Sequence, residues 1–304
     1  MAKSAVAVGG GTGLPLVLRC MLAAGLDATA VVTVADDGGS SGHLRRELGM
    51  LPPGDIRNCL VALSPPGSEL ARVFQYRFAE GQGLAGHALG NLIIAALADI
   101  EGGFAEAVEE AGRLLGVRGR VLPSTLQDVW LSGSDAAGRL IKGQAEVAVS
   151  DGPVGLVRLE PKHPEGYAPA LEALASADVI VIGPGSLFTS IIPNFLVSGV
   201  LEAVARSGAT VVYVCNVANL RGETSGMDAA DHVDALVRHG LDGLIDVALV
   251  HAPERGTAEV DSGAEVRQRI ETRGIRVLGR DLASTSDPAR HDEAKLADVL
   301  GEVW

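Results

Sequence analysis

The N-terminal segment contains the pattern that most constrains the fold: a strand, a glycine-rich loop, a helix and a second strand. Ser4 to Val8 reads as a buried strand, and five small residues, Gly9-Gly10-Gly11-Thr12-Gly13, follow it. Apolar residues then recur at helical spacing until a second apolar strand, Ala30 to Val34. Because this is a βαβ unit, the sequence predicts an α/β fold built on parallel strands.

The same alternation returns in the second half of the chain. Three apolar runs read as strands, and we expect helices between them at roughly Leu196 to Arg206 and Ala229 to Arg238. Aromatic residues make up only 3% of the chain and apolar residues 47%, a mixture that suits parallel strands covered by helices. The strands are Val179 to Ile182, Thr210 to Val214 and Val247 to Val250.

The middle of the chain has a different pattern. Between Val121 and Leu159, short apolar runs are separated by Gly and Pro, and the runs at Val129 to Leu131, Ala145 to Val149 and Val154 to Leu159 read as strands. We therefore expect one domain over residues 1–304 with a β-rich insertion at about 120–160. Residues after about Thr257 carry no informative pattern.

Charge and cysteine content exclude several classes of protein. The net charge of −13 makes a basic nucleic-acid surface improbable. Three cysteines without a CxxC pair fit a reducing cytoplasm better than a disulfide framework. No apolar run is long enough to span a bilayer, and the first strand begins too early for a signal peptide. We expect a cytoplasmic protein.

Two glycine loops are candidates for phosphate binding. Gly10 to Gly13 follow the first strand, and Gly183-Pro184-Gly185-Ser186 follow another apolar strand. Small residues let the backbone approach a phosphate, and a following helix points its N–H groups at it. The first loop is neither the dinucleotide fingerprint nor a P-loop, and each loop alone could be a mere turn. Two loops at the ends of parallel strands can face one crevice and bind a nucleotide-type ligand together.

Acidic residues close the second strand. Asp36 and Asp37 could reach a ribose hydroxyl, hold Mg²⁺ through water, or only cap a turn. The next residues, Gly38-Gly39-Ser40-Ser41-Gly42, match the nucleophile elbow of hydrolases weakly. A second phosphate-cradling loop explains Gly39, Ser40 and Ser41 better, in a long loop over Ala35 to Pro53 with one short helix at Leu44 to Leu48.

Further polar residues lie at the starts of two predicted helices. Asp55 sits where an N-cap belongs, before Ile56 to Leu63, and Arg57 and Asn58 could bind a ligand or be solvated. His87 and Asn91 share a face of a helix that covers Leu89 to Ile100. No second His or Cys stands at metal spacing, which disfavours a zinc site.

These motifs together closely resemble the YvcK-like proteins, or gluconeogenesis factors, of the YvcK/CofD superfamily. The resemblance covers about Ala5 to Ala252. The matching segments are Gly9 to Gly13, Thr33 to Gly42, Pro52 to Asn58, His87 to Asn91, Gly183 to Asn194, Cys215-Asn216 and Gly222 to Thr224.

The resemblance implies a modified Rossmann-like, doubly wound fold that binds a nucleotide sugar such as UDP-glucose or UDP-N-acetylglucosamine. It also implies a cytoplasmic, regulatory role in cell shape, cell-wall synthesis and growth on gluconeogenic carbon sources, without established catalysis. The oligomeric state, for which a homo-oligomer is one option, and the protein partners in envelope synthesis stay open. The expected ligand-binding residues are Gly10, Gly11, Thr12, Gly13, Asp36, Asp37, Gly39, Ser40, Ser41, Asp55, Arg57, Asn58, His87, Asn91, Gly183, Gly185, Ser186, Asn194, Asn216, Glu223 and Thr224.

The alternative is the related CofD branch, a transferase that joins phospholactate-type groups to a deazaflavin in coenzyme F420 synthesis. That branch typically lacks the run Ala35 to Gly42 seen here, so the resemblance favours the YvcK-like branch. In a transferase, Mg²⁺ held by Asp36 and Asp37 would be the expected metal.

Overall fold

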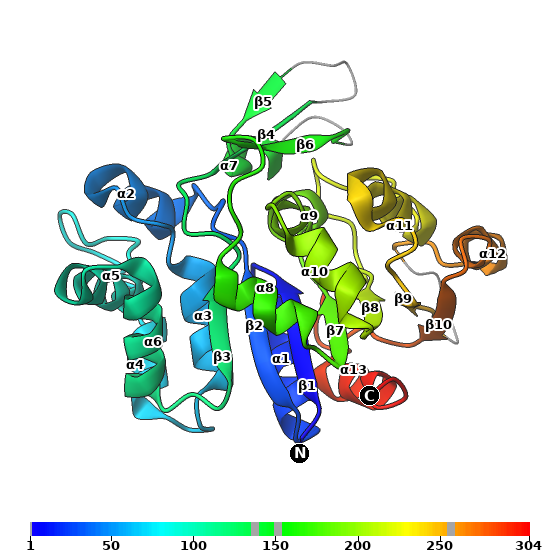
Figure 1. Cartoon of the computed structure of the whole chain (residues 1–304), viewed down its shortest axis with the longest axis horizontal. Helices are drawn as coiled ribbons and strands as arrows, with labels where there is room; N and C mark the ends of the chain where they lie inside the picture. Colours follow the sequence, from blue (N-terminus) through cyan, green and yellow to red (C-terminus); the bar gives the residue numbers. More distant parts are fainter. Residues whose placement is uncertain (1, 135–139, 149–153, 254–258) are drawn as a thin grey trace.

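The structure, a computed structural model of the chain, describes residues 2–134, 140–148, 154–253 and 259–304. Within these residues, seven parallel strands form the main sheet, in the order β3-β2-β1-β7-β8-β9-β10 (Figure 1). The order reverses between β1 and β7, as it does in doubly wound nucleotide-binding folds, so the predicted Rossmann-like α/β class is confirmed. The strands are β1 (Ser4–Gly9), β2 (Asp27–Val32), β3 (Arg120–Pro123), β7 (Val179–Ile182), β8 (Thr210–Val214), β9 (Val247–His251) and β10 (Arg276–Arg280).

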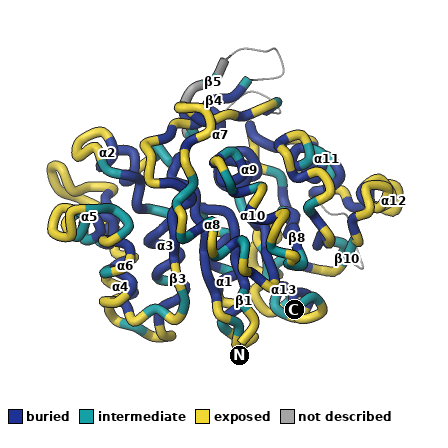
Figure 2. Tube along the Cα trace, in the orientation of Figure 1, coloured by how far each residue is buried: buried dark blue, intermediate teal, exposed yellow. Residues whose placement is uncertain are grey.

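Helices cover both faces of this sheet, and its strands are almost entirely buried except the edge strand β10 (Figure 2). Along β1, Ala5 and Ala7 face one core, while Val6 and Val8 face the other, because successive side chains of a strand point to opposite sides. The first face is covered by α1 (Leu14–Ala23), α3 (Gly54–Leu63), α6 (Phe104–Leu115) and α13 (Glu293–Leu300). The second is covered by α8 (Ala168–Ala175), α10 (Val200–Ser207), α11 (Ala229–Leu236) and α12 (Ala264–Glu271).

The β-rich insertion is a small antiparallel sheet with the order β5-β4-β6, which lies beyond the carboxyl ends of the main strands (Figure 1). Arg45 anchors it to the main body, because its guanidinium lies 3.8 Å from the centre of the Trp130 ring and donates to the Val129 carbonyl. The elements are β4 (Trp130–Ser134), β5 (Leu140–Lys142), a helix α7 (Gln144–Ala148) and β6 (Val157–Glu160).

The structure corrects two features of the predicted insertion. Residues 121–123, placed in the insertion, belong to β3, which pairs with β2 as an edge strand of the main sheet. The run at Ala145 to Val149 was expected to be a strand but is helix α7 as far as Ala148, and Val149 lies outside the described residues. An apolar run this short does not distinguish a strand from a helix by periodicity alone.

Several local elements also differ from expectation. The helix after the second strand is α2 (Gly39–Leu48), so its first turn contains the residues expected in a glycine loop. Asp55 is not an N-cap, because α3 begins at Gly54. His87 precedes α5 (Leu89–Glu101) instead of lying on it, and the helix expected from Leu196 begins only at Val200. The remaining helical elements are α4 (Glu69–Gln75), the π-helix η1 (Leu187–Ile191), α9 (Ile192–Phe195) and the π-helix η2 (Val237–Leu241).

No helix in the described part of the chain is long and apolar enough to cross a membrane.

Candidate functional site

The first glycine loop joins β1 to α1 at the carboxyl edge of the sheet. Gly11 has φ +67°, a left-handed conformation that glycine adopts without steric cost. No side chain caps the first turn of α1. Within the described residues, the backbone N–H groups of Thr12 and Gly13 donate no hydrogen bond. The loop therefore offers open donors and the positive end of a helix dipole to an anion.

The second glycine loop packs directly against the first. A methyl group on Gly13 would overlap the carbonyl oxygen of Pro184, and one on Gly185 would lie 3.3 Å from the carbonyl oxygen of Gly10. The loops come from β1 and β7, the two strands between which the strand order reverses. Open α/β sheets bind ligands at this point, so the geometry brings both predicted loops to the expected crevice.

Three backbone donors in and just after the second loop are already occupied by side chains of the protein. Asn216, at the end of β8, accepts a hydrogen bond from the Gly185 N–H at 3.1 Å and donates to the Gly185 carbonyl at 2.8 Å. The carboxylate of Glu223 accepts hydrogen bonds from the N–H groups of Phe188 and Thr189 at 2.7 and 2.9 Å. Burial raises the pKa of Glu223. Glu223 thus fills the place that an anionic ligand could take.

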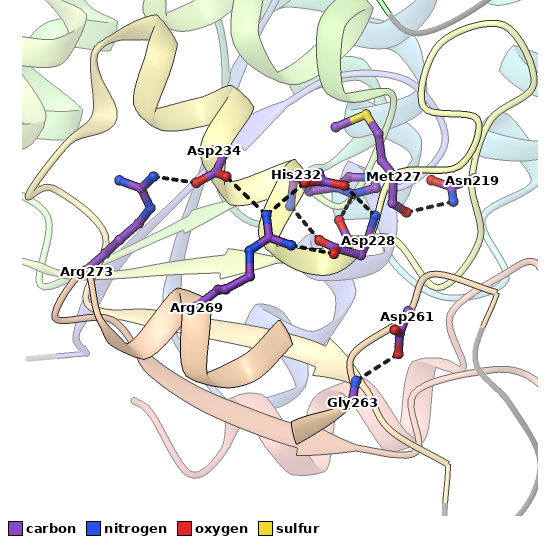
Figure 3. A network of polar contacts seen from close by, with 10 residues as sticks. Asn219, Met227, Asp228, His232, Asp234, Asp261, Gly263, Arg269 and Arg273 are labelled. Atoms are coloured by element: carbon purple, nitrogen blue, oxygen red, sulfur yellow. Dashed lines mark hydrogen bonds and ion pairs between the residues drawn. The ribbon is translucent and has the colours of Figure 1, made fainter. Parts of the chain in front are cut away.

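A polar network holds the segment that carries Glu223 (Figure 3). Asn219 donates to the Met227 carbonyl at 2.9 Å and closes this segment into a loop. Asp228 caps α11, and Arg269 of α12 pairs with the Asp228 carboxylate at 2.6 Å. These contacts attach the segment that carries Glu223 to α11 and α12, the helices on the second face of the sheet.

A cavity of about 480 Å³ opens where the two loops meet. This volume is within the range of small-molecule sites. Several residues expected at the ligand line it: Gly11, Thr12, Gly13, Asp36, Asp55, Gly185, Ser186 and Asn216.

Two carboxylates, Asp36 and Asp55, reach the cavity from different elements. Burial and the neighbouring Asp36 raise the pKa of Asp55 to about 6, although the Gly11 N–H opposes this shift by donating to the Asp55 carboxylate. Burial also raises the pKa of Asp36. Asp37 does not line the cavity, and its Oδ2 accepts a hydrogen bond from the Gln144 N–H of α7 at 3.0 Å. The acid pair at the cavity is therefore Asp36 with Asp55 and not Asp36 with Asp37.

The chain is similar to known proteins over nearly its full length. The family model of the 2-phospho-L-lactate transferase CofD matches residues 5–284. A gluconeogenesis factor of Halalkalibacterium halodurans is 41% identical over 99% of this chain and 96% of its own length. One of Bacillus subtilis is 42% identical over 97% of this chain and 96% of its own. A crystal structure of a Bacillus halodurans protein matches with a TM-score of 0.93 at 41% identity and covers 99% of both chains.

The chain belongs to the gluconeogenesis factor family. The resemblance drawn from the glycine loops and from the run Ala35 to Gly42 is thereby confirmed.

In this member of the gluconeogenesis factor family, four of the expected site residues form a buried network beside the cavity. Ser40 of α2 lies 3.1 Å from His87 Nδ1 and accepts a hydrogen bond from Asn91 Nδ2 at 3.0 Å. Arg57 donates to Asn91 Oδ1 at 2.7 Å, and burial lowers the pKa of Arg57 to about 10. The network joins α2, α3 and α5 and does not line the cavity. It therefore holds α3, which carries Asp55, against α2, which follows the loop that carries Asp36.

The nucleophile-elbow alternative is not favoured by this geometry. Ser40 has a histidine partner, but both side chains are buried, and the Ser40 hydroxyl already accepts a hydrogen bond from Asn91. Neither group reaches the cavity where a substrate would bind. Gly39 is exposed at the start of α2, and the Ser41 hydroxyl accepts a hydrogen bond from the Gly54 N–H at 3.1 Å.

Other expected site residues lie behind the loops. Asn194 is fully buried, and its Nδ2 donates to the carbonyl oxygen of Gly9 at 3.1 Å. The Thr224 hydroxyl accepts a hydrogen bond from the Leu220 N–H at 2.9 Å. Gly183 has φ +74° and lies against the Val214 carbonyl. These residues shape the loops, while Asn58 lines a separate groove described below.

Sequence reasoning missed several residues that line the cavity, among them Arg19 of α1, Gln144 of α7, and Arg290 and His291 near the C-terminus. His291 Nε2–H donates to the Cys215 carbonyl at 3.0 Å, and burial lowers the pKa of His291 to about 4. Arg290 and His291 stand in a polar segment without periodicity, so no local pattern marked them. Arg290 and His291 reach the cavity because they lie in the segment between β10, a strand of the main sheet, and α13, which packs on that sheet.

Proposed function

We propose that this chain binds a nucleotide sugar, UDP-glucose or UDP-N-acetylglucosamine, in the cavity between the two glycine loops, and acts as a regulator in the cytoplasm. The observation that carries the proposal is the first loop, whose Thr12 and Gly13 N–H groups are open at the start of α1. A diphosphate has the charge and the acceptor oxygens that such a loop selects.

The surrounding groups suit the remainder of a nucleotide. Arg19 and Arg290 bring guanidinium donors to the cavity wall, where Arg19 also pairs with Glu293 and Arg290 with Asp287. Asp36 can accept a hydrogen bond from a ribose hydroxyl, the role of an acid at the end of a second strand in this class of fold. The names of the relatives support a role in growth on gluconeogenic carbon sources. The proposal includes roles in cell shape and cell-wall synthesis, which the family resemblance implies.

The second candidate is a phospho-group transferase of the CofD type. It is favoured by the Asp36 and Asp55 pair, because two partly buried carboxylates at one cavity can share a Mg²⁺ ion. Such an ion would neutralise charge that develops on a transferred phosphate. The family model that matches residues 5–284 carries the name of such an enzyme.

Calorimetry with a panel of UDP-glucose, UDP-N-acetylglucosamine, GDP and a deazaflavin, each with and without Mg²⁺, separates the two candidates. We expect the UDP-sugars to bind most tightly, with little dependence on Mg²⁺ and no breakdown products by chromatography. Tighter binding of the deazaflavin would contradict the proposal. Mg²⁺-dependent turnover of the nucleotide would also contradict it, if Asp55→Asn abolished this turnover and the control variant Asp99→Asn, at an exposed position, retained it.

A further inference from the structure

A second hollow lies beside the cavity. It is a groove of about 760 Å³ between α1, α3 and α4, and Thr12 and Arg19 line both the groove and the cavity. Arg19 is held at this border by Glu293 of α13, whose carboxylate lies 2.7 Å from the Arg19 Nε. Thr12 and Arg19 therefore form a border that the cavity and the groove share.

The course of the helices divides the groove into two halves. Helices α1 and α3 run away from the carboxyl edge of the sheet, while α4 runs back toward it (Figure 1). The near half, beside Thr12, is consequently bounded by Pro15, Arg19, Asn58 and Gln75. The far half is bounded by the ends of α1 and α3 and by the turn before α4.

The near half combines polar and apolar groups in the way that a sugar ring requires. Asn58 Oδ1 accepts hydrogen bonds from Arg57 Nη2 at 2.7 Å and from Gln75 Nε2 at 3.4 Å. Within the described residues, Asn58 Nδ2 and Gln75 Oε1 make no hydrogen bond. The residues that line the groove thus include this donor and this acceptor, together with the apolar Pro15 and Val61. Sugar hydroxyls both donate and accept, and the ring has an apolar face.

We propose that the glycosyl end of the nucleotide sugar leaves the cavity across Thr12 and binds in the near half of the groove, against Asn58 and Gln75. This inference rests on the proposed function and assigns each end of the ligand to one hollow. The diphosphate lies at Thr12 and Gly13, between the nucleoside in the cavity and the sugar in the groove. It also accounts for Asn58, which shares a motif with Asp55 but lines the groove only.

Filling the groove tests the inference. Gln75 is exposed at the end of α4, so Gln75→Trp should fold and place an indole in the near half. Val73→Trp, at an exposed position of the same helix outside the groove, is the matched control. Calorimetry with UDP and with UDP-N-acetylglucosamine is the measurement. We expect Gln75→Trp to weaken the UDP-sugar about tenfold or more and to leave UDP within about twofold, because only sugar contacts are lost.

A second variant tests the polar contact alone. Gln75→Leu keeps the size of the side chain, adds no charge and removes the Oε1 acceptor, so it should weaken the UDP-sugar about threefold to tenfold and leave UDP unchanged. Equal effects on UDP and on the UDP-sugar, or no effect from either variant, would overturn the sugar assignment and leave the proposed function standing. A wild-type protein that binds neither compound would overturn both.

Discussion

The two glycine loops have similar sequences and similar places at the ends of parallel strands, yet their hydrogen bonds differ. In the first loop, the N–H groups of Thr12 and Gly13 are open to the cavity. In the second, Glu223 takes the N–H groups of Phe188 and Thr189, and Asn216 takes that of Gly185. In the first loop Gly11 donates to a carboxylate of the protein, that of Asp55, and two further N–H groups stay available to a ligand.

The difference assigns separate roles to the loops. The second loop forms a wall of the cavity, because the N–H groups of Gly185, Phe188 and Thr189 already donate to side chains of the protein and would have to break these hydrogen bonds to bind a ligand. The first loop is the binding element, because a ligand can satisfy its donors without breaking any contact in the protein.

The largest effect is expected from removing the internal anion of the second loop. Glu223→Ala would leave two buried N–H groups without a partner, at a cost of roughly 2–5 kcal/mol in the free energy of unfolding. Glu223→Gln keeps one acceptor and should cost less. Chemical denaturation gives both values, and the exposed Glu202→Ala is the control. A loss from Glu223→Ala no greater than that of the control would show that the second loop does not depend on its carboxylate.

The contact between the loops can be broken at Gly13. Gly13→Ala places a methyl group on the Pro184 carbonyl, so the loops must separate, and affinity for the UDP-sugar should fall about a hundredfold or more. Gly155→Ala is a suitable control, because the added methyl group lies at an ordinary 3.4 Å from its nearest neighbour, Ser134 Oγ. Calorimetry and thermal unfolding measured together separate lost binding from lost folding. Unchanged affinity in Gly13→Ala would mean that the spacing of the loops is irrelevant to the ligand.

The hydroxyl groups of the two loops allow a matched comparison. Thr12 faces the cavity, whereas the Ser186 hydroxyl makes a hydrogen bond to Glu223. Removing one hydrogen bond to a charged ligand costs about 1.5–3 kcal/mol, so Thr12→Val should weaken the UDP-sugar about tenfold to a hundredfold. Ser186→Ala should change affinity by less than about threefold. If calorimetry showed a larger loss of affinity from Ser186→Ala than from Thr12→Val, the second loop and not the first would be the binding element.

The acid beside the first loop predicts a pH dependence of stability. The pKa of Asp55 is raised to about 6 in the folded protein, so the folded state binds more protons than the unfolded state between pH about 4 and 6. Stability should therefore fall as the pH rises through this window, on the order of 1 kcal/mol from this group. Asp55→Asn should flatten that part of the profile, measured by urea denaturation at several pH values. An unchanged slope would show that Asp55 is not desolvated.

Local sequence patterns predicted strands of the main sheet and the two glycine loops that follow β1 and β7, because periodicity and glycine content are local properties. Strands β7 and β8 begin and end at the predicted residues, and both loops lie at the same edge of the sheet. The role of Glu223 could not be read from the sequence, because it depends on which N–H groups the folded chain brings to its carboxylate. The same holds for Asp55, which replaces Asp37 as the neighbour of Asp36 at the cavity.

Segments distant in sequence account for the remaining differences. His87 and Asn91 were expected together on one helix, but they meet at the Ser40 hydroxyl because the chain before α5 folds back on α2. Arg290 and His291 reach the cavity only through the packing of β10 and α13, which no periodicity in that region indicated.

Backbone amide chemical shifts test the central claim most directly. In an amide NMR spectrum recorded during titration with UDP-glucose, we expect the N–H signals of Thr12 and Gly13 to shift strongly and to saturate with the ligand. The signals of Phe188 and Thr189, whose N–H groups donate to Glu223, should stay within the range of distant residues. Saturating shifts at Phe188 and Thr189, with Thr12 and Gly13 unmoved, would contradict the account.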